Sequence, residues 1–182
     1  ASAAGITAGR ASFEAFANVS LDSSTTNAIS TVAANVTGDG SSFSLTNNTE
    51  LTIGTVRSAS STMMTPVDVA GITTMNGDVI IDNGLSEMFI GTGAGESIAA
   101  GNGTVTLTAD GVTERLGSTV SAAELDLNGT GLFDLNQLNM VGTLAADITG
   151  NLIFQDSDAL TIGTVTNTGI TTDGNDVTLT TG

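Results

Sequence analysis

The sequence predicts an all-β fold, a right-handed parallel β-helix (β-solenoid) of about nine coils with almost no helix. Three observations lead there: short alternating apolar segments, blocks of sequence that occur twice, and few aromatic residues. The 182 residues include six Phe and neither Trp nor Tyr. Sandwich and barrel cores depend on aromatic anchors, whereas a narrow solenoid interior fills with Val, Ile, Leu and Ala. The right hand follows from the general rule for crossovers between parallel strands.

Apolar residues alternate with small polar ones over short stretches, as in Leu51–Ile53 and Val177–Thr180. A period of two bounded by Gly, Asn or Asp indicates half-buried strands. Ile53 and Ile162 are therefore expected inside the solenoid and Thr52 outside. No segment keeps a helical period of 3.6 residues over three capped turns.

Several blocks return in the same order. Asp22–Gly38 matches Asp134–Gly150 at seven identical positions, and LTIGTV stands at Leu51–Val56 and at Leu160–Val165. GITT likewise opens similar blocks at residues 71–84 and 169–182. The repeat is about 110 residues long, and such periods are typical of stacked architectures. We interpret 1–182 as one continuous solenoid segment, with copies at roughly 6–117 and 118–182, the second incomplete.

Residues 57–70 have no counterpart in the second copy and are interpreted as an inserted loop. The segment holds the only Pro and two adjacent Met residues. Loops on rigid scaffolds often carry recognition, although sequence drift in a permissive loop is the simpler explanation of the insertion. The possible recognition residues in this loop are Arg57, Met63, Met64, Pro66 and Asp68.

Charge excludes several classes of partner. The chain has three Arg, no Lys or His, and a net charge of −16 at pH 7. Without a basic cluster nothing can replace the counterions of a phosphate backbone, so no nucleic acid partner is expected. Membrane insertion is not expected either, because no apolar run reaches spanning length. The absence of Cys excludes disulfides and thiolate metal sites. No signal peptide is visible at the start, and we expect the chain to be an internal piece of a longer protein.

The chain is not expected to be an enzyme, and no catalytic or cofactor-binding residue is predicted. Parallel β-helices include polysaccharide-active enzymes, but only carboxylates and three Arg are present for acid–base work. Glu114 and Arg115 are the sole adjacent acid and base, and they are interpreted as a surface ion pair.

Calcium is the one cofactor for which candidate ligands exist, because hard cations bind oxygen atoms presented by turns. No complete calcium-binding motif is present, and turn geometry alone explains why Asp, Gly and Asn occur there. The weak metal candidates are Asp156, Asp158, Asp173 and Asp176.

The blocks NxxxTxAAxxTG, LTIGTV and GITTxxxDVxxxxxG resemble the repeats of large filamentous-haemagglutinin-like exoproteins. The resemblance covers roughly Phe13 to Gly182. It implies a bacterial surface adhesin exported by two-partner secretion or as an autotransporter, with a parallel β-helix stalk. It also implies an extracellular or cell-surface location and a role in cell adhesion, biofilm or filament structure. The amino-terminal targeting region of that family is missing, as is any recognisable effector tip.

Three functions follow as hypotheses. The first is a structural stalk or filament segment, whose partners are copies of itself end to end or neighbouring repeats of a longer chain. The second is a carbohydrate- or calcium-binding module, with host or matrix glycans as partners. The third is a polysaccharide-active enzyme. A glycan array, a calcium titration and a turnover screen on acidic polysaccharides would separate them.

Overall fold

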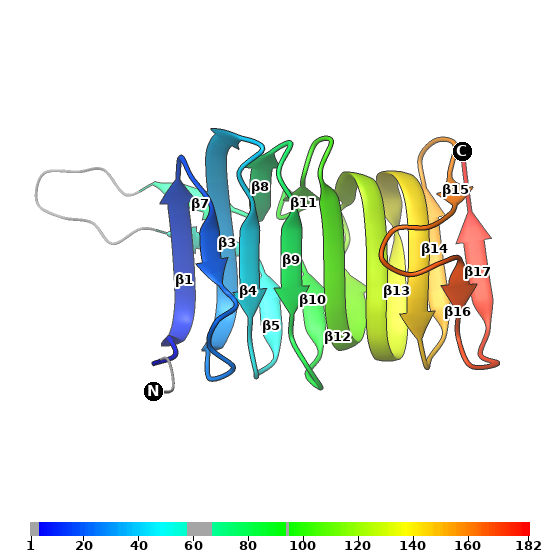
Figure 1. The fold of residues 1–182 in the computed structure, drawn as a ribbon, viewed down its shortest axis with the longest axis horizontal. Coiled ribbons are helices and arrows are strands. Elements are labelled where there is room, and N and C mark those ends of the chain that lie inside the picture. Colours follow the sequence, from blue (N-terminus) through cyan, green and yellow to red (C-terminus); the bar gives the residue numbers. More distant parts are fainter. Residues whose placement is uncertain (1–3, 58–66, 94) are drawn as a thin grey trace, which may run out of the picture.

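The structure is a computed structural model that describes residues 4–57, 67–93 and 95–182, and every regular element within them is a β-strand. Fifteen strands form one sheet in which all pairings between strands are parallel. Two further strands form a small antiparallel sheet. Figure 1 shows the strands side by side along one long axis. The predicted all-β parallel solenoid is confirmed.

The strands are short except for β13, which runs through more than one coil. Their bounds are β1 Thr7–Ala15, β2 Val19–Leu21, β3 Ala28–Asp39, β4 Phe43–Thr46, β5 Leu51–Ile53, β6 Thr55–Arg57, β7 Asp68–Ala70, β8 Ile72–Met75, β9 Val79–Asp82, β10 Met88–Ile90, β11 Ile98–Ala99, β12 Thr104–Glu114, β13 Val120–Ile148, β14 Leu152–Asp156, β15 Thr161–Ile162, β16 Ile170–Thr171 and β17 Val177–Thr180.

Three stacks of strands make up the wall of the solenoid. Stack A runs through β1, β3, β5, β10, β12, β13, β14 and β17, eight levels that agree with the expected number of about nine coils. Stack B contains the second half of β3, then β8, β11 and the start of β13. Stack C contains β2, β4, β9, the first half of β12 and the middle of β13.

The core consists of apolar side chains that stack in columns inside the coils. One inward column of stack A runs from the first level to the last. The register shifts in the β12–β13 and β13–β14 pairings lie outside this column. Parallel pairing therefore places its side chains above one another at the strand spacing of about 4.8 Å. The column consists of Ala11, Val32, Ile53, Ile90, Glu114, Leu135, Phe154 and Leu179.

Buried asparagines occupy one corner of successive coils, between stacks C and A. Asn27, Asn47 and Asn83 are at most 2% exposed. The Oδ1 atom of Asn47 accepts the Ile29 N–H at 2.8 Å, and its Nδ2 donates to Asn83 Oδ1 at 2.9 Å. The amides thus satisfy backbone groups that the turn would otherwise leave buried and unpaired.

Each matching block ends in a glycine for a steric reason. A Cβ on Gly38 would lie 1.8 Å from the Phe16 carbonyl oxygen, and one on Gly150 would lie 1.6 Å from that of Gly131. Neighbouring coils approach too closely at this corner for any side chain.

The two sequence copies lie on different faces of the solenoid. Leu51–Ile53 belongs to stack A, whereas Thr161 and Ile162 pair with Thr143 and Leu144 of β13. That part of β13 continues stack C, since the Thr149 N–H binds the Gly129 carbonyl. Conversely β9 lies in stack C, and its counterpart β17 lies in stack A. Matching blocks therefore do not stack on each other.

The expected burial of Ile162 is wrong, although that of Ile53 is confirmed. Ile53 is fully buried, whereas Ile162 is 43% exposed. The two residues differ in exposure because they lie at different positions along the solenoid axis. Ile53 has strands on both sides, but β15 pairs only with β13, so no later coil within the described residues covers Ile162.

Candidate functional site

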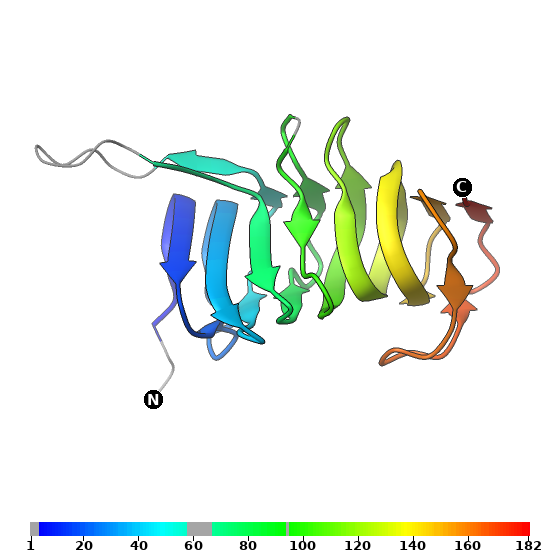
Figure 2. The same cartoon turned by 90° about the horizontal axis from the view of Figure 1, so that it is seen from above.

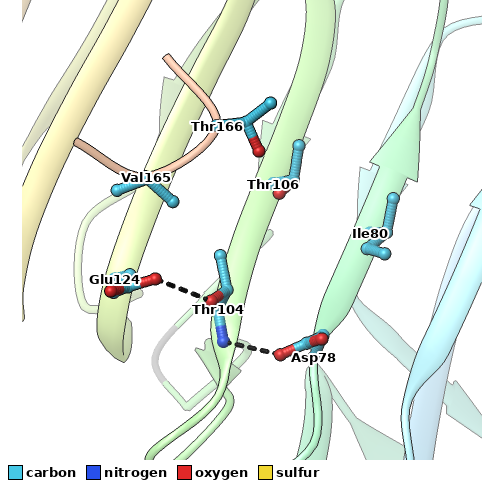
Figure 3. Close-up of a pocket in the computed structure, with 7 residues that line it drawn as sticks. All are labelled: Asp78, Ile80, Thr104, Thr106, Glu124, Val165 and Thr166. Carbon is cyan, nitrogen blue, oxygen red and sulfur yellow. Dashed lines mark hydrogen bonds between the residues drawn. The ribbon is translucent and has the colours of Figure 1, made fainter. Parts of the chain in front are cut away.

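A groove on the outer face of stack C is the candidate site, and its seven lining residues are drawn in Figure 3. Its volume is about 260 Å³. Strands β9, β12 and β13 form the floor, and the loop of residues 163–169, between β15 and β16, forms one wall. Figure 1 shows this loop lying across β13. The lining residues are Asp78, Ile80, Thr104, Thr106, Glu124, Val165 and Thr166.

Two carboxylates flank a threonine on the groove floor. Thr104 pairs with Glu124 on the next strand and donates its hydroxyl to Glu124 Oε2 at 3.1 Å. Its backbone N–H donates to Asp78 Oδ1 at 2.9 Å (Figure 3). The alternation of these strands points all three side chains outward, because their neighbours Val79, Val105 and Leu125 are buried.

The wall of the groove is held by an asparagine. Asn167 Nδ2 donates to Asp126 Oδ1 at 3.1 Å and to Asn128 Oδ1 at 2.7 Å, both on β13. Asp126 points outward from its strand, yet it is 0% exposed. The loop therefore covers this carboxylate, and a charged hydrogen bond holds it in place.

The groove suits a polar ligand. Its surface offers carboxylate oxygens and threonine hydroxyls beside the apolar Ile80 and Val165, and no aromatic side chain lines it. Sequence reasoning missed the site. Alternation predicts which strand residues face outward, but it contains no information on where a loop distant in sequence folds back.

The weak calcium candidates lie at two separate corners of the last coils. Asp156 is the last residue of β14 and Asp158 follows it, whereas Asp173 and Asp176 precede β17. Asp156 is 1% exposed, and its two oxygens accept the N–H groups of Val141 and Asp158. Burial raises the pKa of Asp156. No cluster of three or more metal-ligating side chains occurs among the described residues. A role for calcium stays a prediction that a titration would check.

The inserted segment begins and ends as a hairpin. Strands β6 and β7 pair antiparallel, and Arg57 lies 3.9 Å from Asp68 across them with both side chains more than half exposed. An exposed pair of this kind contributes little stability. The other possible recognition residues, Met63, Met64 and Pro66, lie outside the described residues.

Glu96 anchors the loop after β10 and the base of this hairpin. Burial raises its pKa, but hydrogen bonds from the Thr55 and Thr92 hydroxyls and from the N–H groups of Thr92 and Gly93 outweigh burial and hold the pKa at about 2. The side chain is 6% exposed. A carboxylate that accepts several bonds is stabilised in its charged form.

Glu96→Gln is expected to lower the free energy of unfolding by about 1–2 kcal/mol at pH 7, because charged hydrogen bonds become neutral ones. A lowered pKa contributes stability above the ordinary value of 4.5 that is lost as the pH falls toward 2. The variant and the parent should therefore converge near pH 2. Urea denaturation at several pH values measures this, with the exposed Glu87→Gln as the control. A constant difference from pH 7 to pH 2 would contradict the assignment.

The surface ion pair expected between Glu114 and Arg115 is wrong. It is 4% exposed and lies in the apolar column of stack A, next to Ile90. Arg115 does not pair with it; its guanidinium lies 4.6 Å from the centre of the Phe89 ring. Alternation from Val112 already indicated an inward residue at 114, so the signal was present in the sequence.

The Glu114 carboxyl group is only partly satisfied. Its Oε2 accepts the Gln137 N–H at 3.0 Å and Asn139 Nδ2 at 3.1 Å, while Oε1 is buried without a hydrogen bond. Burial, and to a smaller extent the charge of Asp134, raises the pKa of Glu114 to about 7 despite those two bonds. The group is therefore largely protonated at mildly acidic pH.

Neither a protein-family model, nor a curated protein, nor a solved structure matches this chain. The resemblance to filamentous-haemagglutinin-like repeats therefore stays a prediction. Among the residues that the structure describes, no helix has the length and apolarity needed to cross a membrane.

Proposed function

We propose that the chain is a structural segment of the stalk or filament of an extracellular surface protein, and that it supports adhesion, biofilm or fibre assembly. One observation carries this proposal. The apolar interior reaches the last described coil without an element that covers it. Solenoids normally need a polar capping element at an end that faces water.

The last level of stack A exposes its inward side chains. Val177 and Leu179 stack on the buried Leu152 and Phe154, yet they are 43% and 38% exposed. Strand β17 pairs with β14 alone among the described residues. Its other edge presents unpaired backbone groups, a template for one more parallel strand.

The first coil presents the opposite edge. Strand β1 pairs with β3 alone within the described part, and the inward Ala11 and Phe13 are only partly buried. Edge strands are usually protected by Lys, Pro or a bulge that prevents pairing. Neither β1 nor β17 contains Lys or Pro. Both edges thus fit a further coil of the same kind, from a neighbouring repeat or from a second copy.

A contact between the last coil of one copy and the first coil of the next does not give a closed dimer or ring, and it therefore gives filaments. Sedimentation and electron microscopy at micromolar concentration should show the 182-residue chain in linear assemblies. Leu179→Lys should abolish them, because stacking would bury an unpaired charge, at a cost of about 3 kcal/mol or more. Thr178→Lys adds the same charge on the outer face and should assemble like the parent.

A chain that stays a monomer under these conditions would contradict the end-to-end form of the proposal. Equal assembly of the Leu179→Lys and Thr178→Lys variants would contradict the role given to the inward column. The extracellular location is a separate part of the proposal, and it follows from the resemblance to filamentous-haemagglutinin-like repeats.

Carbohydrate binding is a second candidate function, supported by the outer groove. Carboxylates and hydroxyls that face the same open groove can bind the hydroxyls of a neutral sugar. A glycan array would identify the ligand, and Asp78→Asn with Glu124→Gln should abolish the signal. Asp82→Asn, on the same outer face but outside the groove, is the matched control.

A further inference from the structure

The two carboxylates of the outer groove keep binding capacity that the protein itself does not use. Asp78 accepts the Thr104 N–H through Oδ1, and Glu124 accepts the Thr104 hydroxyl through Oε2 (Figure 3). Within the described part of the chain, Asp78 Oδ2 and Glu124 Oε1 accept no hydrogen bond and are not buried. An ionised carboxylate has about four acceptor positions on its two oxygens. Each side chain can therefore still accept hydrogen bonds from a ligand in the groove.

No basic side chain lies beside these carboxylates. Arg10 is in β1, at the first level of stack A, and the Arg115 guanidinium lies over the Phe89 ring. Arg57 is in the hairpin β6–β7, and Figure 2 shows this hairpin and the groove loop on opposite sides of the solenoid. The chain has no other Arg, and it has no Lys or His. The groove therefore presents uncompensated negative charge to its ligand.

A third carboxylate adds to this negative charge. Asp126 pairs with Thr106 of the groove floor and is 0% exposed beneath the loop. Its hydrogen bonds come from the neutral side-chain amides of Asn128 and Asn167, which supply no positive charge. A buried charge acts on its neighbours more strongly than a charge in water does. The groove therefore disfavours acidic sugars such as uronates and favours a cationic group.

The other lining residues suit a sugar ring. Ile80 is 43% exposed on the floor, and Val165 lies across the groove on the loop, so two aliphatic side chains can contact the C–H groups of a ring (Figure 3). The hydroxyls of Thr106 and Thr166 can bind its hydroxyl groups. The volume of about 260 Å³ lies just below the range of about 300–1,000 Å³ that is typical of pockets for drug-sized ligands. The groove therefore holds a small unit, such as one ring of a longer chain.

We infer that the groove binds a sugar with a free amino group, a hexosamine unit, more tightly than the neutral form of the same sugar. The ammonium group binds beside Thr104, in the field of Asp78 and Glu124. This inference rests on the carbohydrate binding proposed for the groove, and it names the class of sugar. An ammonium has three N–H donors and a full charge, and charged hydrogen bonds are about twice as strong as neutral ones. Acetylation of the amine removes the charge and leaves one donor.

Calorimetric titration with two tetramers of equal length tests the preference. One is a tetramer of glucosamine and the other is its fully N-acetylated form, both at pH 6, where the free amine carries its proton. The parent chain should bind the glucosamine tetramer about tenfold or more tightly than the acetylated one. Added NaCl should reduce this preference, because salt screens the attraction between ammonium and carboxylate.

Single neutral variants assign the preference to the groove. Asp78→Asn and Glu124→Gln each keep an oxygen that accepts from Thr104, but each loses a charge and should lower the preference severalfold. Asp82→Asn removes the same charge from the same strand as Asp78, outside the groove, and should keep the preference of the parent. This control separates the groove from the general attraction of a cation to a chain with a net charge of −16. An equal loss in all three variants would overturn the inference.

The outcomes distinguish the inference from the function on which it rests. Equal affinity of the parent chain for the two tetramers would overturn the preference for an amino sugar and leave carbohydrate binding in place. Binding of neither tetramer would contradict carbohydrate binding itself. Spermidine carries ammonium groups but no sugar ring, and at equimolar concentration it should not displace the glucosamine tetramer. Displacement by spermidine would show that charge alone is recognised, and it would also overturn the inference.

Discussion

Ile53→Asp is expected to unfold the segment at room temperature or to lower its free energy of unfolding by about 4 kcal/mol or more. Ile53 is fully buried between Val32 and Ile90 in the inward column of stack A. A carboxylate at this position would meet only apolar neighbours and no base. Urea denaturation followed by circular dichroism measures the change.

Two matched variants give this prediction its controls. Thr52→Asp changes the neighbouring residue, whose side chain points outward, and should cost less than about 1 kcal/mol. Ile162→Asp changes the equivalent residue of the second copy, which is 43% exposed, and should also be mild in the 182-residue chain. A cost for Thr52→Asp equal to that for Ile53→Asp would contradict the assignment of inner and outer faces.

The Ile162 variant also bears on the proposed stalk. In a form of the protein in which a further coil covers this end, Ile162 becomes an interior residue like Ile53. Ile162→Asp should then cost several times more than in the 182-residue chain. A longer fragment that includes any following coil, compared by the same denaturation experiment, checks this.

Glu114→Gln is expected to raise the free energy of unfolding by roughly 3 kcal/mol above pH 8, where the parent must bury a carboxylate. The glutamine keeps an oxygen that accepts from Gln137 N–H and Asn139 Nδ2, and it adds no charge. The penalty in the parent arises because the pKa of Glu114 rises from its ordinary 4.5 to about 7 on folding.

The sign of the pH dependence follows from that shift. The folded chain binds the Glu114 proton more tightly than the unfolded chain does, so this group lowers stability as the pH rises from about 4.5 through 7. Below pH 4.5 the carboxyl is neutral in both states, and the variant should match the parent there. Urea denaturation between pH 4 and pH 9 measures the difference, with the partly exposed Glu124→Gln as the control. A variant that is destabilised at pH 9 would contradict the assignment.

The sequence alone determined the fold class and the inner and outer faces of most strands. Alternation in Leu51–Ile53 placed Ile53 inside and Thr52 outside, and the structure agrees. This works because side chains in a strand alternate with a period of two, so local pattern is sufficient. The prediction of a surface ion pair between Glu114 and Arg115 was wrong, because it followed the adjacent Arg115 and not the alternation from Val112, which indicates an inward residue at 114.

The repeat in the sequence did not determine which face each block occupies. The paired strands of successive coils are offset by between 17 residues, from Asn139 to Asp156, and 38 residues, from Ala34 to Ile72. The length of the loops and turns sets these offsets. A repeat of about 110 residues is therefore not a whole number of coils, and only the pairing of strands distant in sequence placed β5 and β15 on different faces.

The candidate groove and the exposure of Ile162 were decided by the tertiary structure for the same reason. Both depend on contacts between coils: Asn167 folding back on Asp126 creates the groove wall, and the absence of a covering coil among the described residues exposes Ile162. Local pattern determines which way a side chain points from its strand. What lies in front of that side chain depends on the stacking order of coils, which is a property of the whole folded chain.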